Sequence, residues 1–295
     1  MFKKALQRLD EKLKNSHPDK KKGQTSSHRV EAVNQVFMAC VRTNTDVDYL
    51  LNSIEDGTAF DLAKFRSTPE GNIFDFVKSD LLEAVRYFPH ITAGGNGGMA
   101  SIGKGEFAIA FLSNFSTMMI TERSKDKLQK GKGDLKHSDG TYEEVKYNGG
   151  KINIDDQRGE DVGIRFTKIV QAKNIDIRNV PGTSGGYLPL WKSAEKVYSE
   201  DEIKERNGYY HEAVVGKHIG PLTNEEIAKI FVDRSFKNIF KKVDNLLVMD
   251  SDGSYARFSD PQVAIDYYKD LKVGFELRNF QTNPSTIYLH TKNRY

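Results

Sequence analysis

The chain has 295 residues, of which 38% are hydrophobic and 29% are charged, and its formal net charge is +3. No apolar run reaches the ~18 residues of a membrane-spanning helix, so we expect no membrane segment. The single cysteine, Cys40, excludes an internal disulfide and a cysteine metal cluster. The first residues lack the long apolar stretch of a signal peptide, so we expect a cytoplasmic protein.

Positive charge is concentrated at the N-terminus. Residues 1–30 carry nine lysine or arginine residues against three acidic ones, a local net charge of +6 that leaves −3 for the remainder. A helix is predicted over residues 1–15, with three leucines on one face: Leu6, Leu9 and Leu13. Two hypotheses stand for residues 1–28. They form either a solubilising tail with a docking helix, or an arm that neutralises nucleic-acid phosphates through Lys20, Lys21 and Lys22.

Residues 29–93 are predicted to form a helical subdomain. Apolar periodicity predicts helices over residues 29–42 and 72–88, and a Thr-Asn-Thr-Asp start signal predicts another over 46–54. Pro89 is expected to end the last of these helices.

A glycine-rich loop precedes a short, almost entirely apolar segment. The spacing Gly98-x₄-Gly103-Lys104 matches most of a phosphate-binding P-loop, but Gly105 stands where a serine or threonine must reach Mg²⁺. We therefore interpret the loop as one that closes over a DNA strand, with a plain linker as the alternative. Glu106 is the one charge at the head of the apolar segment, where the dipole of a helix favours a carboxylate.

Residues 131–147 are predicted to form a β-hairpin around a Ser-Asp-Gly turn. Directly opposed residues share a face, so the loop length decides which acids meet. A two-residue loop would place Asp134 opposite Val145, whereas a three-residue loop would place it opposite Glu144. Gly140 stands at the third position of the longer loop, which requires a left-handed backbone. We therefore predict the three-residue loop.

This register gathers two carboxylates and one lysine on one face: Asp134, Glu144 and Lys146. They are the minimum set for holding a divalent metal against a phosphodiester and activating a water. The other face would carry core residues, namely Leu135, Val145 and Tyr147. His137 is expected on that other face, so we assign it no catalytic role. The alternative is a solvated hairpin with ordinary cross-strand ion pairs.

A helix-borne Glu, then an Asp, then Glu-x-Lys across a hairpin resembles the PD-(D/E)XK nucleases, which have the restriction-endonuclease-like fold. The match covers about residues 103–150, under half of the chain, with glycine replacing the family's frequent proline before Asp134. The Gly-x-Gly-Asp-Leu and Glu-Val-Lys motifs are similar to those of nuclease-like proteins of large tailed phages. The resemblance implies that Lys146 orients the attacking water. It also implies a set of Mg²⁺ ligands, with Mn²⁺ as the alternative ion: Asp134, Glu144, the Val145 carbonyl and Glu106 as the outer acid.

Two further features follow the hairpin. Asn148-Gly-Gly would let the backbone approach a phosphate, and three lysines are expected to contact nucleic acid: Lys104, Lys132 and Lys151. The aromatic loop at residues 181–191 is either a partner or base-stacking surface or a loop that folds its Trp191 into the core.

Alternating short elements are predicted for the remainder. The expected strands are at residues 162–169, 175–180, 245–249, 255–258, 272–280 and 285–290, and the expected helices are at 194–207, at 223–242 and from Asp260. We interpret residues 246–249 as the strand that completes the sheet after a long insertion.

These patterns predict an α/β (α+β) protein with a restriction-endonuclease-like mixed sheet flanked by helices and an N-terminal helical extension. The expected division is an arm at 1–28, a helical subdomain at 29–93 and a core at 94–295 with an insertion at about 181–243. The predicted function is Mg²⁺-dependent DNA endonuclease, phage-encoded and acting in the host cytoplasm. One alternative is a non-enzymatic virion or DNA-packaging protein of the same fold. Another is a recombination or replication nuclease or binder on branched DNA. The expected partners are DNA and either a second copy or a phage assembly.

Overall fold

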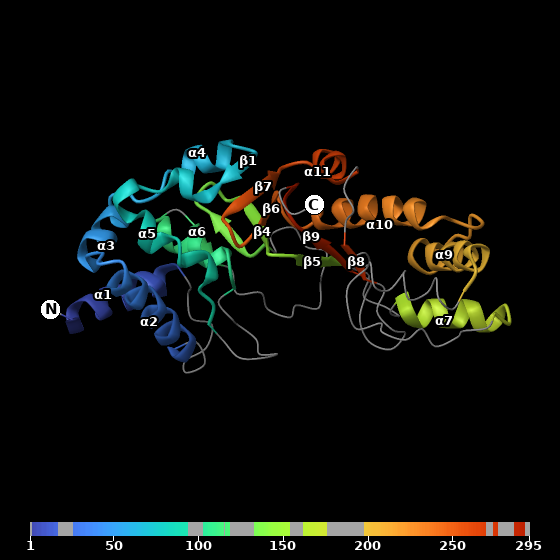
Figure 1. The fold of residues 1–295 in the computed structure, drawn as a ribbon, viewed down its shortest axis with the longest axis horizontal. Coiled ribbons are helices and arrows are strands. Elements are labelled where there is room, and N and C mark those ends of the chain that lie inside the picture. Colours follow the sequence, from blue (N-terminus) through green and yellow to red (C-terminus); the bar gives the residue numbers. More distant parts are fainter. Residues whose placement is uncertain are drawn as a thin grey trace. The chain divides into compact units, whose positions relative to one another are not determined.

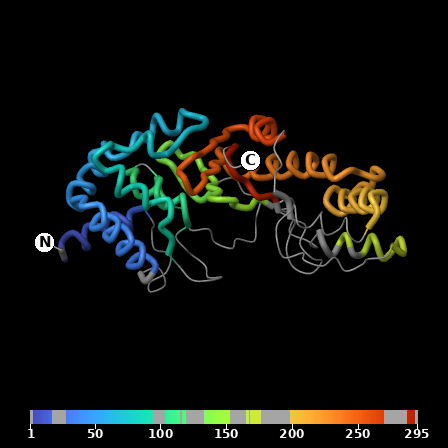
Figure 2. Tube along the Cα trace, viewed as in Figure 1, coloured from blue at the N-terminus to red at the C-terminus, as the bar shows by residue number. Residues whose placement is uncertain are grey.

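The computed structural model describes residues 2–16, 26–93, 103–114, 116–118, 133–153, 162–175, 198–269, 274–276 and 286–292. The chain forms two compact units, whose elements are labelled in Figure 1 and traced in Figure 2. Unit 1 consists mainly of residues 1–148 and 242–259, and unit 2 of residues 149–241 and 260–293. The expected insertion therefore falls in unit 2 as far as residue 241.

Unit 1 is built on a six-stranded mixed sheet in the order β1-β7-β6-β4-β3-β2. The pairing of β4 with β6 is parallel, and the other pairings are antiparallel. The predicted mixed central sheet flanked by helices is thus confirmed, and so is the late strand that joins it. The strands are β1 Glu70–Asn72, β2 Ser116–Met118, β3 Leu135–His137, β4 Tyr142–Tyr147, β6 Asn245–Met249 and β7 Ser254–Phe258.

Helices cover this sheet and supply most of its core. They are α1 Phe2–Ser16, α2 Ser26–Arg42, α3 Val47–Glu55, α4 Leu62–Ser67, α5 Leu82–Val85 and α6 Glu106–Leu112. The α6 residues 107–112 are all buried, and they join one core cluster with Leu135, Val145 and Leu247 of the sheet. In Figure 1, α6 lies beside the strands. A helix that is apolar all round is expected in this position.

The basic helix α1 is docked onto unit 1. Leu9 and Leu13 are fully buried in the core. Arg8 forms an ion pair with Asp48 of α3, and the Lys12 ammonium donates to the Ser113 carbonyl oxygen at 3.3 Å. The helical part of the N-terminal segment is therefore a docking element. The three lysines proposed for phosphate contact, at positions 20–22, lie outside the described residues.

The predicted helix over residues 72–88 is wrong. The segment continues from β1 through short 3₁₀ turns, η1 Ile73–Phe76, η2 Ser79–Leu81 and η3 Phe88–His90, with α5 as its one α-helical turn. The Ile73 N–H donates to the Gly253 carbonyl oxygen at 2.9 Å, and the Asn72 side chain accepts from the Phe74 N–H at 3.0 Å. Tertiary hydrogen bonds to the β6–β7 turn thus replace the intrahelical ones that apolar periodicity suggested.

Unit 2 combines a three-stranded antiparallel sheet with helices. Its sheet has the order β5-β9-β8, with β5 Gly150–Asn153, β8 Gly274–Glu276 and β9 Thr286–Leu289. Its helices are α7 Val162–Ala172, α9 Glu200–Val215, α10 Asn224–Ile239 and α11 Pro261–Tyr268. The predicted helix that begins at Thr223 is confirmed as α10. Capping boxes start both α10, at Thr223, and α9, at Ser199.

The predicted strand over residues 162–169 is wrong, because this segment forms α7. Its apolar residues fit both a period of two and a helical period. Packing selects the helix, because the Phe166 ring stacks on Tyr210 of α9 with ring centroids 3.8 Å apart. Helix α9 runs to Val215, eight residues beyond the predicted end at 207. Residues 176–180 and the aromatic loop at 181–191 lie outside the described part of the chain. Within the described ranges, no helix is both long and apolar enough to cross a bilayer.

Candidate functional site

The hairpin formed by β3 and β4 has the predicted three-residue loop. Leu135 pairs with Glu143, so that Asp134, one residue before β3, comes opposite Glu144 in the same register. Gly140 has the left-handed φ of +85° that the third loop position needs, and its N–H donates to the His137 carbonyl oxygen at 2.9 Å.

The loop itself is fixed by Asp139. One of its carboxylate oxygens accepts from the Thr141 N–H at 3.0 Å, and the other pairs with Arg66 of α4 at 2.8 Å. These contacts hold the pKa of Asp139 well below its usual range. The loop is therefore pinned, which fixes the register of the strand residues behind it.

The first face of the hairpin carries the predicted acids and lysine. Glu144 and Lys146 form an ion pair and are only 19% and 16% exposed. The Asp134 carboxylate accepts from the Val145 N–H at 2.8 Å, which holds it between the two strands. We name the set of Glu106, Asp134, Glu144 and Lys146 the acid cluster.

Glu106 reaches the cluster from the first turn of α6. Gly105, with φ +77°, precedes it, and a Cβ there would lie 3.3 Å from Val145 Cγ1 and 3.2 Å from Tyr147 Cδ2. Glycine at this position thus lets the head of α6 approach β4 closely. The Gly103 backbone hydrogen-bonds the Glu106 carboxylate. A Cβ on Gly103 would lie 1.8 Å from Glu106 Oε1, so glycine at this position lets the carboxylate keep its present place.

The three carboxyl groups share one electrostatic environment. Burial, reinforced by the charge of Glu144, raises the pKa of Asp134 to about 7. Burial and then the charge of Asp134 raise the pKa of Glu106 well above its ordinary value. Burial would lower the pKa of Lys146, but Glu144, Asp134 and Glu106 outweigh it and raise that pKa. One ammonium group thus faces three acids, an excess of negative charge that a bound cation would relieve.

A divalent ion fits this donor set in one particular mode. Among the described residues, no three Asp, Glu, His or Cys side chains converge closely enough to enclose a metal. Mg²⁺, however, is usually held by one or two carboxylates together with waters and substrate phosphates. Asp134 and Glu144 match that mode, whereas the roles of Glu106 and of the Val145 carbonyl as ligands stay predictions.

The opposite face of the hairpin holds a buried polar chain that the sequence interpretation missed. The Ser116 hydroxyl lies 2.8 Å from His137 Nδ1, and His137 Nε2 lies 3.1 Å from Glu143 Oε2. Arg257 of β7 donates to the other Glu143 oxygen. Burial would raise the pKa of Glu143, but His137 and Arg257 hold it below the ordinary value. We name Ser116, His137, Glu143 and Arg257 the buried chain.

The buried chain has the residue types of a hydrolase catalytic triad, but a substrate could not reach its serine. Ser116 is 4% exposed, and the His137 and Glu143 side chains are fully buried. A nucleophile must reach its substrate, so this arrangement is structural. The signal that could have revealed the chain is the register itself, which places Glu143 on the same face as Leu135, where a carboxylate needs partners.

Of the predicted nucleic-acid contacts, two lie in the described part of the chain. Lys104 is exposed two residues before Glu106, and Lys151 is exposed on β5 of unit 2. Lys132 lies outside the described residues, as do the three lysines of the N-terminal arm.

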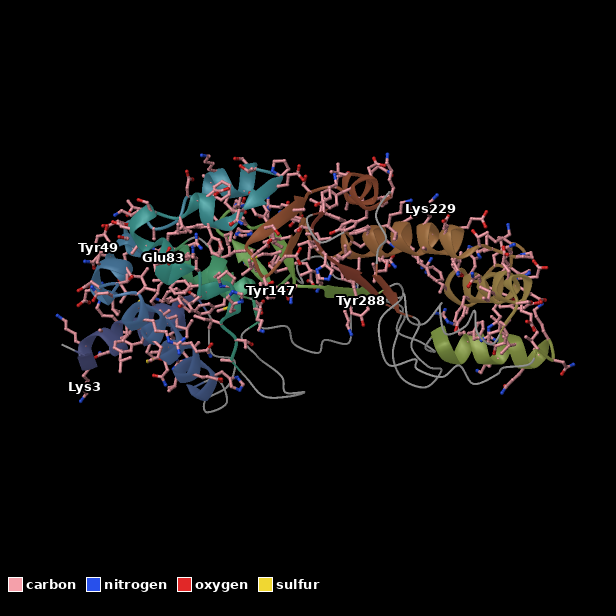
Figure 3. The ribbon with its side chains drawn as sticks, in the orientation of Figure 1. Lys3, Tyr49, Glu83, Tyr147, Lys229 and Tyr288 are labelled. Atoms are coloured by element: carbon pink, nitrogen blue, oxygen red, sulfur yellow. The ribbon has the colours of Figure 1, made fainter. Side chains whose placement is uncertain are left out.

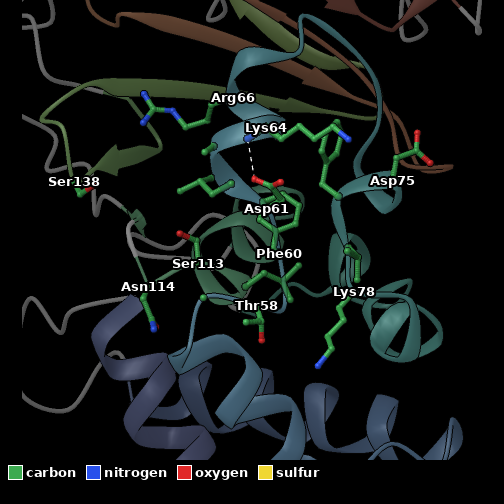
Figure 4. A pocket seen from close by; sticks show the side chains of 16 residues that line it. Thr58, Phe60, Asp61, Lys64, Arg66, Asp75, Lys78, Ser113, Asn114 and Ser138 are labelled. Atoms are coloured by element: carbon green, nitrogen blue, oxygen red, sulfur yellow. Dashed lines mark hydrogen bonds between the residues drawn. The ribbon is translucent and has the colours of Figure 1, made fainter.

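A pocket of about 660 Å³ in unit 1 is separate from the acid cluster (Figure 4). Its lining includes Ser113 just after α6 and Ser138 in the hairpin loop, whereas the acids lie at the other ends of both elements. The carboxylate of Asp61 in this pocket caps α4 by accepting from the Lys64 N–H at 3.0 Å, and Arg66 pairs with Asp139. Both groups serve the local fold, so the acid cluster remains the candidate functional site.

The chain matches no protein-family model, no curated protein and no solved structure.

Proposed function

We propose that the protein is a Mg²⁺-dependent DNA endonuclease with a restriction-endonuclease-like core. One observation carries the proposal. Two carboxylates and a lysine lie on one face of a hairpin whose register is fixed by its loop, and a helix-borne glutamate is electrostatically coupled to them. Burial and neighbouring acids raise the pKa of Asp134 and of Glu106, and clusters of acids shifted in this way are typical of functional sites.

The residues of the cluster have separate parts in this proposal. Asp134 and Glu144 would hold the ion, which when bound supplies Lewis-acid polarisation of the phosphate and lowers the pKa of the attacking water. Lys146 has a raised pKa and so stays protonated, and its ammonium would place a fixed positive charge beside the phosphate. Glu106 keeps its proton to a higher pH than an ordinary glutamate, which suits it to proton transfer at the edge of the site.

The test is a plasmid-nicking assay on the full chain with Mg²⁺, Mn²⁺ or EDTA. We expect nicking of supercoiled DNA with either ion and none in EDTA. Asp134→Asn keeps the shape of the side chain but removes the charge that holds the ion, so nicking should be lost while DNA binding persists. Asp139→Asn is the matched control, because it makes the same chemical change in the same hairpin, where the carboxylate only pins the loop.

The competing interpretation is a non-enzymatic virion or packaging protein that uses the same fold. It would be supported if the wild type nicks nothing with either ion and Asp134→Asn unfolds the chain. Asp134 would then be a structural acid whose bond to the Val145 N–H ties the hairpin together.

A further inference from the structure

Strand β9 of unit 2 separates its side chains cleanly into two faces. Within β9, Ile287 and Leu289 are fully buried whereas Tyr288 is half-buried, and His290, directly after the strand, is half-buried as well. Alternation of this kind marks a sheet with one face on the core and one face open. Figure 3 shows the Tyr288 side chain projecting from this sheet.

Unit 2 has two lysine–tyrosine pairs near β9, and the first of them lies on the open face. Lys151 of β5 is the register partner of Tyr288, and its ammonium lies 4.7 Å from the centre of the tyrosine ring. The Lys292 ammonium lies 4.2 Å from the ring centre of Tyr267 in α11. The Lys292 N–H also donates to the Tyr267 hydroxyl at 2.9 Å, which fixes the end of α11 beside the chain that follows β9.

Close packing marks one end of this face. The His290 ring is so near the backbone that a Cβ on Gly149 would lie 2.8 Å from its Nε2.

We propose that this open face, defined by Lys151, Tyr288 and His290, binds single-stranded DNA. An aromatic ring stacks on unpaired bases of any sequence, and a lysine beside it neutralises a phosphate. A duplex keeps its bases stacked on one another, so Tyr288 favours a single strand. The inference rests on the proposed nuclease function for its biological meaning.

The test measures binding of fluorescein-labelled oligothymidine to the full chain by anisotropy in EDTA, where no cleavage is expected. Tyr288→Ala should weaken binding by about 5- to 150-fold, because one base loses its aromatic partner. Tyr288→Phe retains the ring and should bind nearly as well as the wild type. Duplex DNA of the same length should be far less sensitive to Tyr288→Ala.

The lysine is tested through the salt dependence of binding. Lys151→Ala should make the slope of log K against log salt shallower by about 0.7, the value for one phosphate contact on a single strand. Lys173→Ala is the matched control, because the Lys173 ammonium lies over a tyrosine of unit 2 in the same way, 5.3 Å from the centre of the Tyr209 ring, on the helices. It should leave the slope unchanged.

The inference is overturned if Tyr288→Ala binds oligothymidine as tightly as the wild type, or if the Lys151 and Lys173 variants lose salt dependence equally. Should Tyr288→Ala fail to fold by circular dichroism, the slopes of the two lysine variants decide. Nicking that persists without oligothymidine binding would overturn this inference alone. Oligothymidine binding without nicking would overturn the nuclease proposal alone.

Discussion

Two neighbouring glutamates lie on opposite faces of the β3–β4 hairpin and have different partners there. Glu143 points into the core and meets two positively charged or proton-bearing partners, His137 and Arg257. Glu144 points to the other face, where it shares one lysine with two further acids. The pKa of Glu143 is held below its ordinary value despite burial, while across the hairpin burial raises the pKa of Asp134 to about 7.

This difference teaches that burial alone does not identify a functional acid. A buried carboxylate with complete partners stabilises the fold, whereas buried carboxylates that face one another leave charge uncompensated. Only the second arrangement has something to gain from a metal ion or a phosphate-bound cation. Substitutions on the two faces should therefore affect different properties.

The largest expected effect separates the two glutamates by activity. Glu144→Gln should reduce plasmid nicking by at least about a thousandfold, because a bound ion contributes several kcal/mol at the transition state. The far-ultraviolet circular dichroism should stay that of the wild type. Nicking within tenfold of the wild-type rate would remove Glu144 from the site.

The same substitution one residue earlier should change stability instead. Glu143→Gln leaves Arg257 buried beside a neutral amide, and breaking a buried pair in this way costs about 3–5 kcal/mol of unfolding free energy. Urea denaturation measures the loss, with Glu144→Gln as the control that should lose little. A loss below about 1 kcal/mol would mean that the buried chain is not a stabilising network.

The pH dependence should run in opposite directions on the two faces. Between about pH 4 and pH 7, the folded state keeps a proton on Asp134 that the unfolded state has already lost. The free energy of unfolding of the wild type should therefore fall as pH rises through that range. Without divalent ions, Asp134→Asn should be more stable than the wild type at pH 8, by about 2–4 kcal/mol. The advantage should shrink toward pH 4.

The pKa of Glu143 in the folded state is depressed, so Glu143 contributes to stability above its pKa in the unfolded state, and this contribution is lost as pH falls toward and below pH 4.

Mg²⁺ at a hundred times its dissociation constant should raise the stability of the wild type by about 2.7 kcal/mol, and that of Asp134→Asn by much less. Chemical denaturation across pH, with and without Mg²⁺, measures both effects. If the difference in unfolding free energy between the wild type and Asp134→Asn does not change with pH, the raised pKa assigned to Asp134 is wrong.

The smallest effect is expected at the hairpin loop, which belongs to neither face. Asp139 is about half exposed, and its pair with Arg66 is at the surface. Asp139→Asn should cost about 1 kcal/mol or less, with unchanged nicking. A larger loss in thermal unfolding would show that the loop, and not the two faces, dominates the stability of the hairpin.

Much of the acid cluster was predictable because its determinants are local. Gly140 set the loop length, and the loop length set which side chains share a face. Glu106 was predictable because one charge preceded an apolar run. The mixed sheet was predictable in outline, since residues 245–249 are apolar throughout and bounded by turn residues.

The missed features depend on partners that are distant in sequence. The burial of Glu143 was missed because its partner Arg257 follows 114 residues later. The segment at 72–88 has helical periodicity, but its backbone bonds to the turn at Gly253. Periodicity could not choose between strand and helix at 162–172, and the stacking of Phe166 on Tyr210 decides it.

The parallel pairing of β4 with β6 has a consequence for synthesis of the chain on the ribosome. The hairpin can form as soon as its residues emerge, but β6 begins about a hundred residues after β4. At 5–20 residues per second, the nascent hairpin waits roughly 5–20 s for the strand that completes its sheet. During that time Arg257, the partner of Glu143, has not yet been synthesised, and the edge of β4 is open to pairing with other chains. Closing so long a loop is slow, so assembly of the sheet is expected to be a late step of folding.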